Sequence, residues 1–280
     1  AWNQASRALP YRKARVISRS GAAMSFSASE RERYARHILL KEVGGPGQQK
    51  LKGATIAIVG VGGLGAPAAL YLAAAGVGTL RLIDHDTVAL SNLQRQVIFS
   101  TEDVGAPKTS SAEGALMALN PHVDVDARAV RLTPDNAAAL LDGADLVLDG
   151  TDDFVTRFTV NDACHELGLP LVSGAVGRWD GQVAVFKSGP TRHLAPAERM
   201  PCYRCFVPEA PLDAETCERA GIVGALPGII GAMMALEAIK EITGAGESLA
   251  GRVLLYDGLA ANARDVALKR DPNCAVCRDR

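Results

Sequence analysis

Three glycines, Gly60, Gly62 and Gly65, have the spacing G-x-G-x-x-G and stand between a predicted strand and a predicted helix. In this setting, backbone N–H groups and the helix N-terminus can hold a phosphate group. Asp84 follows about 20 residues later, at the end of the next predicted strand, where a carboxylate can accept hydrogen bonds from ribose hydroxyls. The loop and the acid together predict a nucleotide site, and a purely structural glycine turn is the alternative.

The charges that follow the loop favour a triphosphate over NAD. Asn92 and Arg95 lie in the loop after Asp84, and Lys108 stands at the start of the next predicted helix. Of these residues, Arg95 and Lys108 add positive charge where a dinucleotide needs little. Spacing alone also allows Arg95 and Lys108 to be solvated surface charges. A nicotinamide dehydrogenase would need an acid or base paired at a hydride-transfer site, and the sequence offers no convincing pair.

Four of the six cysteines form two C-x-x-C pairs, Cys202 with Cys205 and Cys274 with Cys277. Four thiolates complete a closed tetrahedral zinc site of the structural kind, which leaves no position for a catalytic water. The gap between the pairs exceeds that of a zinc ribbon, so the fold must bring them together. A thioredoxin-like redox pair is the alternative, but neither pair begins a helix after a βαβ strand.

The elements that must position these residues alternate along the chain. Apolar runs at 55–59, 79–83, 146–148 and 170–172 and an alternating run at 123–129 predict strands, and helices are expected at 64–75, 110–119, from 134 and at 154–167. This order predicts an α/β fold with a doubly wound, Rossmann-like, mostly parallel sheet. Beyond residue 174, expected strands at 182–186 and 253–256, with a helix at 227–243, indicate an antiparallel extension and a small zinc-bearing lobe.

The first predicted helix begins near Ser29, which with Glu32 has the pattern of a capping box, and glycines at 44–47 are expected to end it. Residues 1–28 are interpreted as an N-terminal arm that is disordered or not native, because residues 1–23 carry five arginines and lysines and no acid. A transit peptide and translated upstream sequence are both open. The remainder, 29–280, is expected to be one domain.

Composition excludes several classes of function. The 30 Lys and Arg residues balance 31 Asp and Glu residues, so neither nucleic acid nor an acidic membrane surface is expected as a partner. With 48% hydrophobic and 22% charged residues the 280-residue chain can bury a large core. The longest uncharged stretch, 53–80, is interrupted by glycines and Pro67, so no membrane span is predicted. Sparse cysteines in C-x-x-C pairs favour a reducing, cytoplasmic location.

Eight strings in the chain, in this order, resemble the ThiF/MoeB/HesA family of ubiquitin-like-protein-activating enzymes. They are GVGGLG (60–65), DHDTVALSNLQRQ (84–96), GAPK (105–108), GTDD (150–153), SGAVGRWDGQVAVF (173–186), PCYRC (201–205), TCERAG (216–221) and CAVC (274–277). The likeness covers about residues 30–277. It implies that ATP and the C-terminal Gly-Gly carboxylate of a ubiquitin-fold sulfur-carrier protein react to give an acyl-adenylate and pyrophosphate.

The resemblance also implies roles for single residues. Arg95 and Lys108 match positions that contact the phosphates, and Asp152 matches the acid that holds Mg²⁺. Nucleotide-binding positions are matched by Gly60, Gly62, Gly63, Gly65, Asp84 and Asn92. Arg36 matches an arginine that family dimers offer to the partner's ATP, so a homodimer is expected; a surface arginine is the alternative. Asp153 stands where the family usually has Asn, and it can cap the following helix, so its contact with the nucleotide stays open.

Within the family, the chain is most similar to the adenylyltransferases of molybdopterin synthesis, which act on a MoaD-like carrier. The same chemistry on the ThiS-like carrier of thiamin-thiazole synthesis is an alternative, and so is a non-catalytic partner subunit. The resemblance places nucleotide binding at about 53–173 and carrier and zinc binding at about 174–280. Cys217 matches a position where some relatives accept the acyl group or sulfur; otherwise a separate donor enzyme supplies the sulfur.

Overall fold

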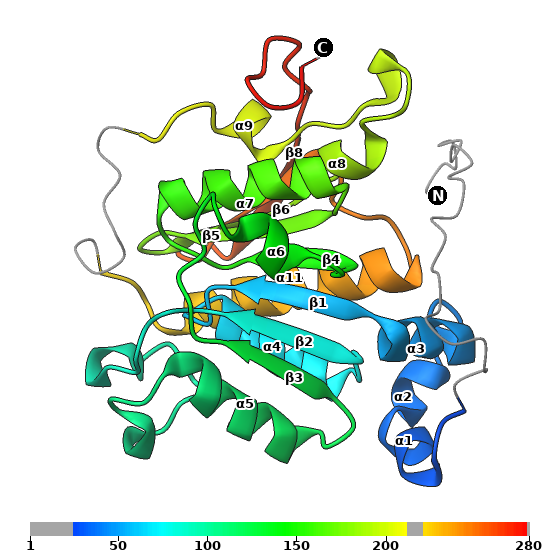
Figure 1. Ribbon diagram of the computed structural model, residues 1–280, viewed down its shortest axis with the longest axis vertical. Coiled ribbons are helices and arrows are strands. Elements are labelled where there is room, and N and C mark those ends of the chain that lie inside the picture. The colour runs from blue at the N-terminus through cyan, green and yellow to red at the C-terminus, as the bar shows by residue number, and fades with distance from the viewer. Residues whose placement is uncertain (1–24, 212–220, 279–280) are drawn as a thin grey trace.

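The computed structural model describes residues 25–211 and 221–278, and its centre is a twisted eight-stranded sheet (Figure 1). The strand order is β3-β2-β1-β4-β5-β6-β7-β8. The strands are β1 (Thr55–Val59), β2 (Thr79–Ile83), β3 (Asp124–Arg128), β4 (Leu146–Asp149), β5 (Leu171–Val176), β6 (Asp180–Phe186), β7 (Arg252–Asp257) and β8 (Asn262–Ala267). The first five are parallel, and β6, β7 and β8 extend the sheet in antiparallel fashion.

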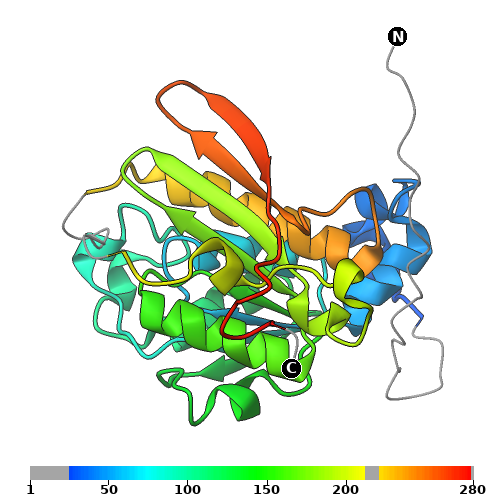
Figure 2. The ribbon, with the colours of Figure 1, turned by 90° about the horizontal axis from the view of Figure 1, so that it is seen from above.

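Helices cover both faces of the parallel part. They are α1 (Ala28–Arg33), α2 (Ala35–Ile38), α3 (Gly44–Gly53), α4 (Gly65–Ala74), α5 (Lys108–Leu119), α6 (Ala137–Leu141), α7 (Phe154–Leu167), α8 (Ser188–Thr191), α9 (Tyr203–Phe206) and α11 (Ala225–Thr243), with 3-10 turns η1 (Leu90–Asn92), η2 (Thr101–Asp103) and η3 (Pro196–Glu198). Seen from above, α11 and α7 lie on opposite sides of the sheet (Figure 2). The doubly wound Rossmann-like fold predicted from the sequence is therefore confirmed.

Two apolar cores lie on the two faces of the sheet. The larger core joins the inward sides of β1, β2 and β4 to α4, α5 and α11, and the smaller joins the opposite side of the sheet to α6, α7 and Tyr203. Alternate residues of β1 divide between them, with Ile56 and Ile58 in the first and Ala57 and Val59 in the second. This follows from the two-residue period of a strand buried on both faces.

The N-terminal capping box differs from the prediction by two residues. Ser27, and not Ser29, caps α1: its Oγ accepts a hydrogen bond from the Glu30 backbone N–H at 3.1 Å, and the Ser27 N–H donates to Glu30 Oε2 at 2.8 Å. Ser29 and Glu32 have the same local spacing, but Glu30 is buried and forms an ion pair of 2.6 Å with Lys52. A tertiary contact therefore selects the first of two equivalent boxes.

Two further elements were not expected. The glycines at 44–47, predicted to end a helix, instead begin α3, which tolerates Pro46 because the first turn of a helix needs no donor at that position. Strand β8 is exposed along its whole length and carries no apolar pattern, yet it pairs with β7 from Arg252–Ala267 to Asp257–Asn262.

Within the described ranges, no helix combines the length and apolarity needed to cross a bilayer.

Strand order reverses direction between β1 and β4, which lie side by side while their connections run to opposite faces. In open α/β sheets, ligands bind outside the carboxyl ends of the strands at such a point. The loops after β1 (Gly60–Leu64), β2 (from Asp84) and β4 (Gly150–Asp153) all leave the sheet at this edge. The fold thus collects the three predicted nucleotide-binding segments at one place.

Candidate functional site

A cavity of about 710 Å³ lies at this edge of the sheet. Its walls come from the glycine loop, the segment after β2, the start of α5, the GTDD loop and the residues around α9. Nine of the predicted residues line it, namely Gly60, Gly62, Gly63, Asp84, Asn92, Arg95, Lys108, Asp152 and Asp153. Predicted residues that are up to 93 positions apart in the sequence, from Gly60 to Asp153, are therefore brought into one site.

Two glycines of the loop are required by backbone geometry. Gly60 has a φ of +83°, a conformation that L side chains rarely adopt. A Cβ atom on Gly65 would lie 1.9 Å from the Gly60 carbonyl oxygen, so only glycine allows α4 to start this close to β1. Gly65 is not among the cavity-lining residues, and its role here is to let the helix N-terminus approach the loop.

Asp84 is buried and fixed to the glycine loop. Its Oδ2 accepts a hydrogen bond from the Val61 backbone N–H at 2.7 Å, and its Oδ1 accepts one from the Asp86 N–H at 2.9 Å. Each carboxylate oxygen has a second lone pair, so both can still accept from a ligand hydroxyl. The acid predicted for the ribose thus lies at the cavity wall in a fixed orientation.

The two predicted cations, Arg95 and Lys108, both line the cavity. Lys108 is buried, is the first residue of α5, and its Nζ lies 2.8 Å from Asp86 Oδ2. Arg95 is half-buried and donates from Nη1 to the Ser91 carbonyl at 3.1 Å. Burial would raise the pKa of Asp86, but the hydrogen bond and charge of Lys108 hold that pKa below its usual value. Asp86 thus stays ionised and keeps Nζ in the cavity wall, where its other protons can reach an anion.

The neighbouring residues Asp152 and Asp153 have different surroundings. Asp152 is exposed, lines the cavity and accepts no hydrogen bond within the described chain. Asp153 is the N-cap of α7, because its Oδ1 accepts from the Thr156 backbone N–H at 2.8 Å. The capping role considered from the sequence is therefore confirmed.

Asn92 is buried, and its Oδ1 accepts from the Ala89 N–H at 3.2 Å, which holds the turn that carries Arg95.

Replacing Asp153 with alanine is expected to lower the free energy of unfolding by about 1 kcal/mol, since it removes the cap of α7. Asp153→Asn should change that free energy by only a few tenths of a kcal/mol, because Asn is an equally good N-cap. Urea unfolding followed by circular dichroism measures both. Equal losses in the two variants would contradict the capping role and point to a need for the negative charge.

A buried polar network beneath the GTDD loop was not predicted. Asp149, 1% exposed at the end of β4, accepts hydrogen bonds at Oδ1 from the Thr151 N–H at 3.0 Å and the Thr151 hydroxyl at 2.7 Å. Arg157 of α7 lines the cavity and donates to the Thr151 carbonyl and to Ser173 Oγ. The only sequence signal was the position of Arg157, five residues after Asp152.

Arg36 lies apart from this cavity. It is an exposed residue of α2 and is not among the residues that line the site of its own chain. Tyr34, just before α2, is buried; its hydroxyl accepts a hydrogen bond from Asn120 Nδ2 at 2.9 Å, which anchors the helix that carries Arg36. Within one chain, the predicted arginine and the predicted nucleotide site are therefore not brought together.

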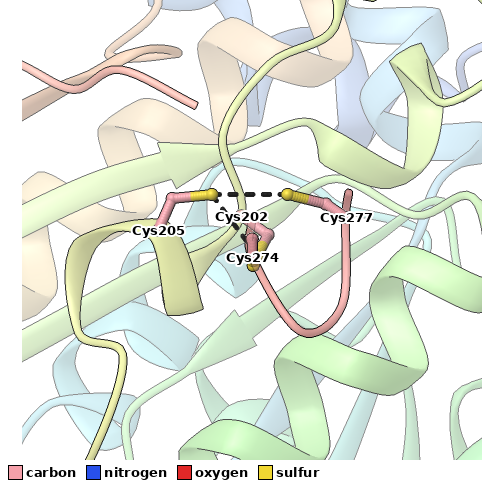
Figure 3. A group of neighbouring side chains, drawn as sticks. All are labelled: Cys202, Cys205, Cys274 and Cys277. Carbon is pink, nitrogen blue, oxygen red and sulfur yellow. Dashed lines mark hydrogen bonds between the residues drawn. The ribbon is translucent and has the colours of Figure 1, made fainter. Parts of the chain in front are cut away.

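The four cysteines of the two C-x-x-C pairs do meet (Figure 3). The distances between sulfur atoms are 3.5 Å for Cys202 and Cys274, 3.3 Å for Cys205 and Cys277, and 4.0 Å for Cys202 and Cys205. A zinc ion with Zn–S bonds of about 2.3 Å places tetrahedral sulfurs roughly 3.8 Å apart, so the cluster fits zinc. The S–H groups of Cys202 and Cys277 and the Asp271 N–H hold the pKa of Cys205 below its usual value.

The other two cysteines stand apart from this cluster. Cys164 of α7 is buried, and burial together with nearby Asp149 raises the pKa of its thiol, so it is an inert core residue. Cys217, the predicted acceptor of an acyl group or sulfur, lies outside the described residues.

A second cavity of about 660 Å³ adjoins the first. It lies on the antiparallel extension, between the ends of β5 and β6 and the β7–β8 hairpin that projects from the body (Figure 2). Polar residues such as Asp180, Tyr256 and Arg264 line it. Three residues, Ala175, Val176 and Gln182, line both cavities, so the two lie next to each other.

Known proteins are similar to this chain along most of its length. The sulfur carrier protein adenylyltransferase of Thermus thermophilus is 48% identical over 258 residues, 91% of this chain and 94% of that protein. The SAMP-activating enzyme E1 of Haloferax volcanii is 42% identical over 256 residues, 91% of each protein. The crystal structure of E. coli MccB with AMPCPP and MccA matches 88% of this chain and 74% of that one, with a TM-score of 0.72 and 26% identity.

The family model described as ThiF matches residues 34–276, almost the whole of the described structure. The match spans both the glycine-loop half and the cysteine-bearing half, as the sequence strings predicted. The chain therefore belongs to the ThiF family.

Proposed function

We propose that this protein is an ATP-dependent adenylyltransferase that activates the C-terminal Gly-Gly carboxylate of a ubiquitin-fold sulfur-carrier protein. The product is an acyl-adenylate, and pyrophosphate is released. The observation that carries the proposal is one cavity lined by a glycine loop, a ribose-type acid, the predicted cations Arg95 and Lys108, and a carboxylate with no hydrogen-bond partner among the described residues. The 48% identical relative from Thermus thermophilus is named a sulfur carrier protein adenylyltransferase, which supports the proposal.

The charges in the cavity match the needs of the reaction. An anionic carboxylate must approach the α-phosphorus of a polyanionic nucleotide, so charge must be screened at the attacked phosphate and on the departing pyrophosphate. The new bond joins a carboxylate oxygen to the α-phosphorus as the bond between the α- and β-phosphates breaks. In this proposal Arg95 and Lys108 contact the phosphates, the glycine-loop N–H groups bind them, and Asp84 holds the ribose.

Asp152 is the proposed holder of Mg²⁺. Its carboxylate is exposed in the cavity and has no partner within the described residues, and carboxylate oxygens suit a hard cation that also binds phosphate. When bound, Mg²⁺ would neutralise charge on the phosphate oxygens. Asp153, whose Oδ1 is engaged in the helix cap, is proposed to shape the loop rather than to bind the nucleotide.

The two adjoining cavities support a division of the domain into halves. We place the nucleotide at the half formed by about residues 53–173 and the body of the carrier on the extension formed by about 174–280. The groove on β5–β8 would hold the carrier, and its shared border at Ala175, Val176 and Gln182 gives a flexible Gly-Gly tail a route to the nucleotide. The Cys202, Cys205, Cys274 and Cys277 cluster is proposed to bind a structural zinc ion.

Arg36 is proposed to act on the nucleotide of the partner in a homodimer, since it is exposed and outside the cavity of its own chain. If so, mixing two inactive variants, Arg36→Ala and Asp152→Ala, should restore activity, because the heterodimer contains one site with both residues intact. Random mixing gives about one quarter of the wild-type rate for a two-fold dimer. Pyrophosphate exchange after mixing measures it, and no recovery, despite heterodimers, would contradict action in trans.

The pathway is proposed to be molybdopterin synthesis, with a MoaD-like carrier and a separate sulfur-donor enzyme in the cytoplasm. ATP–pyrophosphate exchange tests the reaction and the carrier together, with purified protein, Mg²⁺ and in turn the molybdopterin-type and thiamin-type carriers. Carriers without the terminal Gly-Gly are the controls. Exchange that needs an intact tail would establish the activity and identify the carrier, whereas tight ATP binding without exchange would indicate a non-catalytic subunit.

Cys217→Ala should leave exchange unchanged, because the proposed adenylation step does not use a cysteine.

A further inference from the structure

Arg157 is a buried charged residue that follows the proposed metal-binding loop, 150–153, on the next helix. It is 5% exposed, sits on the first turns of α7, and lines the nucleotide cavity together with Asp152. Its Nη1 lies 3.7 Å from Asp149 Oδ2 and 3.4 Å from Ser173 Oγ, and its Nη2 donates to the Thr151 carbonyl. The guanidinium thus joins the ends of β4 and β5 to the peptide group that precedes Asp152.

Hydrogen bonds around Arg157 hold both the backbone N–H and the backbone carbonyl of Thr151. Asp149 accepts from the Thr151 N–H and hydroxyl, and Arg157 donates to the carbonyl of the same residue. Ser173 Oγ also donates to Asp149 Oδ2 at 3.2 Å, which holds the carboxylate in place. The two charges compensate each other, so the network can be buried directly under an anion-binding cavity. A rotation at Thr151 would therefore break several hydrogen bonds at once.

A purely stabilising role explains this network poorly. Replacing a buried ion pair with apolar residues is often neutral or stabilising, because the desolvation of two charges offsets their attraction. Tyr203 responds to the same guanidinium: burial raises the pKa of Tyr203, and the positive charge of Arg157 acts in the opposite direction. Tyr203 stands between the cluster cysteines Cys202 and Cys205 and itself lines the cavity.

We infer that Arg157 is a positioning residue that orients the Asp152 carboxylate toward the metal–nucleotide complex through its bond to the Thr151 carbonyl. Residues that orient a metal ligand typically change metal affinity or activity by about 10–100-fold when they are replaced. The metal part of this inference rests on the proposed function. The orienting of the 150–153 loop does not, because it is a property of the free protein.

The first test compares Arg157→Lys with Arg81→Lys. Lysine keeps the charge opposite Asp149 but cannot donate from one rigid plane to a carboxylate, a hydroxyl and a carbonyl. Arg81 is a matched control, since it also bonds to a carboxylate, Asp126, and to main-chain carbonyls, yet it does not line the cavity. In the protein with no nucleotide or Mg²⁺, Arg157→Lys should increase deuterium uptake at 150–153, and Arg81→Lys should not.

The second test titrates Mg²⁺ in the exchange reaction at saturating ATP and carrier. Arg157→Lys should need about 10–100-fold more Mg²⁺ for its half-maximal rate, as expected for a lost orienting contact, whereas Arg81→Lys should keep the wild-type value. Unchanged deuterium uptake, or a change confined to the KM for ATP, would overturn the inference in favour of a structural role or direct phosphate binding. A wild-type protein without exchange activity would defeat the proposed function but leave the uptake test valid.

If Arg157→Lys does not fold, the paired variant Asp149→Asn with Arg157→Met leaves no buried charge uncompensated. The amide oxygen introduced at position 149 can still accept from the Thr151 N–H. The loss of the donor to the Thr151 carbonyl should again increase deuterium uptake at 150–153. Wild-type uptake in this folded double variant would overturn the inference.

Discussion

Replacing Asp152 with alanine is expected to lower carrier-dependent ATP–pyrophosphate exchange by about 10²–10³-fold, because a bound metal ion contributes several kcal/mol of charge stabilisation in the transition state. The fold should not suffer, since the side chain is exposed and accepts no hydrogen bond within the described residues. Asp142→Ala is the matched control: Asp142 is also an exposed acid, but it does not line the cavity. Its exchange rate should equal that of the wild type.

Binding of ATP without metal separates the proposed role from simple damage to the pocket. In EDTA, Asp152→Ala should bind ATP at least as tightly as the wild type, because a carboxylate that repels the phosphates has been removed. With Mg²⁺, the wild type should gain affinity and the variant should gain little. Isothermal titration in both conditions measures this, and wild-type exchange kinetics in the variant would show that Asp152 does not hold the metal.

Much of the nucleotide site could be predicted from the sequence because its signals are local. The glycine loop, Asp84 and Lys108 each occupy the boundary of an element whose apolar period is clear, and parallel strands bring such boundaries to one edge of the sheet. The structure places all of them around one cavity. The cysteine cluster was predictable for a different reason: four ligands of one chemistry imply a common site even when the intervening fold is unknown.

The elements that were missed depend on tertiary contacts. Two overlapping boxes, Ser27 with Glu30 and Ser29 with Glu32, satisfy the same local rule, and the ion pair of Glu30 with Lys52 decides between them. Helix α3 begins with glycines and proline, which are poor signals, but it buries Leu51 completely against the larger core. Packing therefore outweighs helix propensity at this position.

The Asp149–Arg157 network could not be derived from the sequence for the same reason. In the sequence Asp149 merely follows the strand predicted at 146–148, and Arg157 is an ordinary polar residue of the helix predicted at 154–167. Only the packing of α7 over β4 and β5 brings the two within 3.7 Å and aims the guanidinium at Thr151. Positioning residues of this kind have no spacing rule, because the residues they act through are set by the packing of separate elements.

Removal of metal from the four-cysteine cluster is expected to destabilise the domain strongly, since structural zinc contributes on the order of 10 kcal/mol to the folding of small metal-dependent units. The cluster ties the 274–277 segment to Cys202 and Cys205, and Tyr203 between them packs in the smaller core. Cys202→Ser should therefore lose zinc and show a large fall in melting temperature. Zinc content by mass spectrometry and thermal unfolding with and without a chelator measure this.

Cys164→Ala is the matched control for that experiment, because Cys164 is also buried and a free thiol but stands outside the cluster. It should keep the full zinc content and lose only the stability that a small cavity costs. A redox pair makes the opposite prediction: the protein would contain no zinc, a chelator would not change its melting temperature, and mild oxidation would reversibly join Cys202 to Cys205. Three of the sulfur–sulfur separations are 3.3–4.0 Å and all four sulfur atoms lie within 4.8 Å of one another, which favours zinc because one ion at the centre of a tetrahedron needs such spacings.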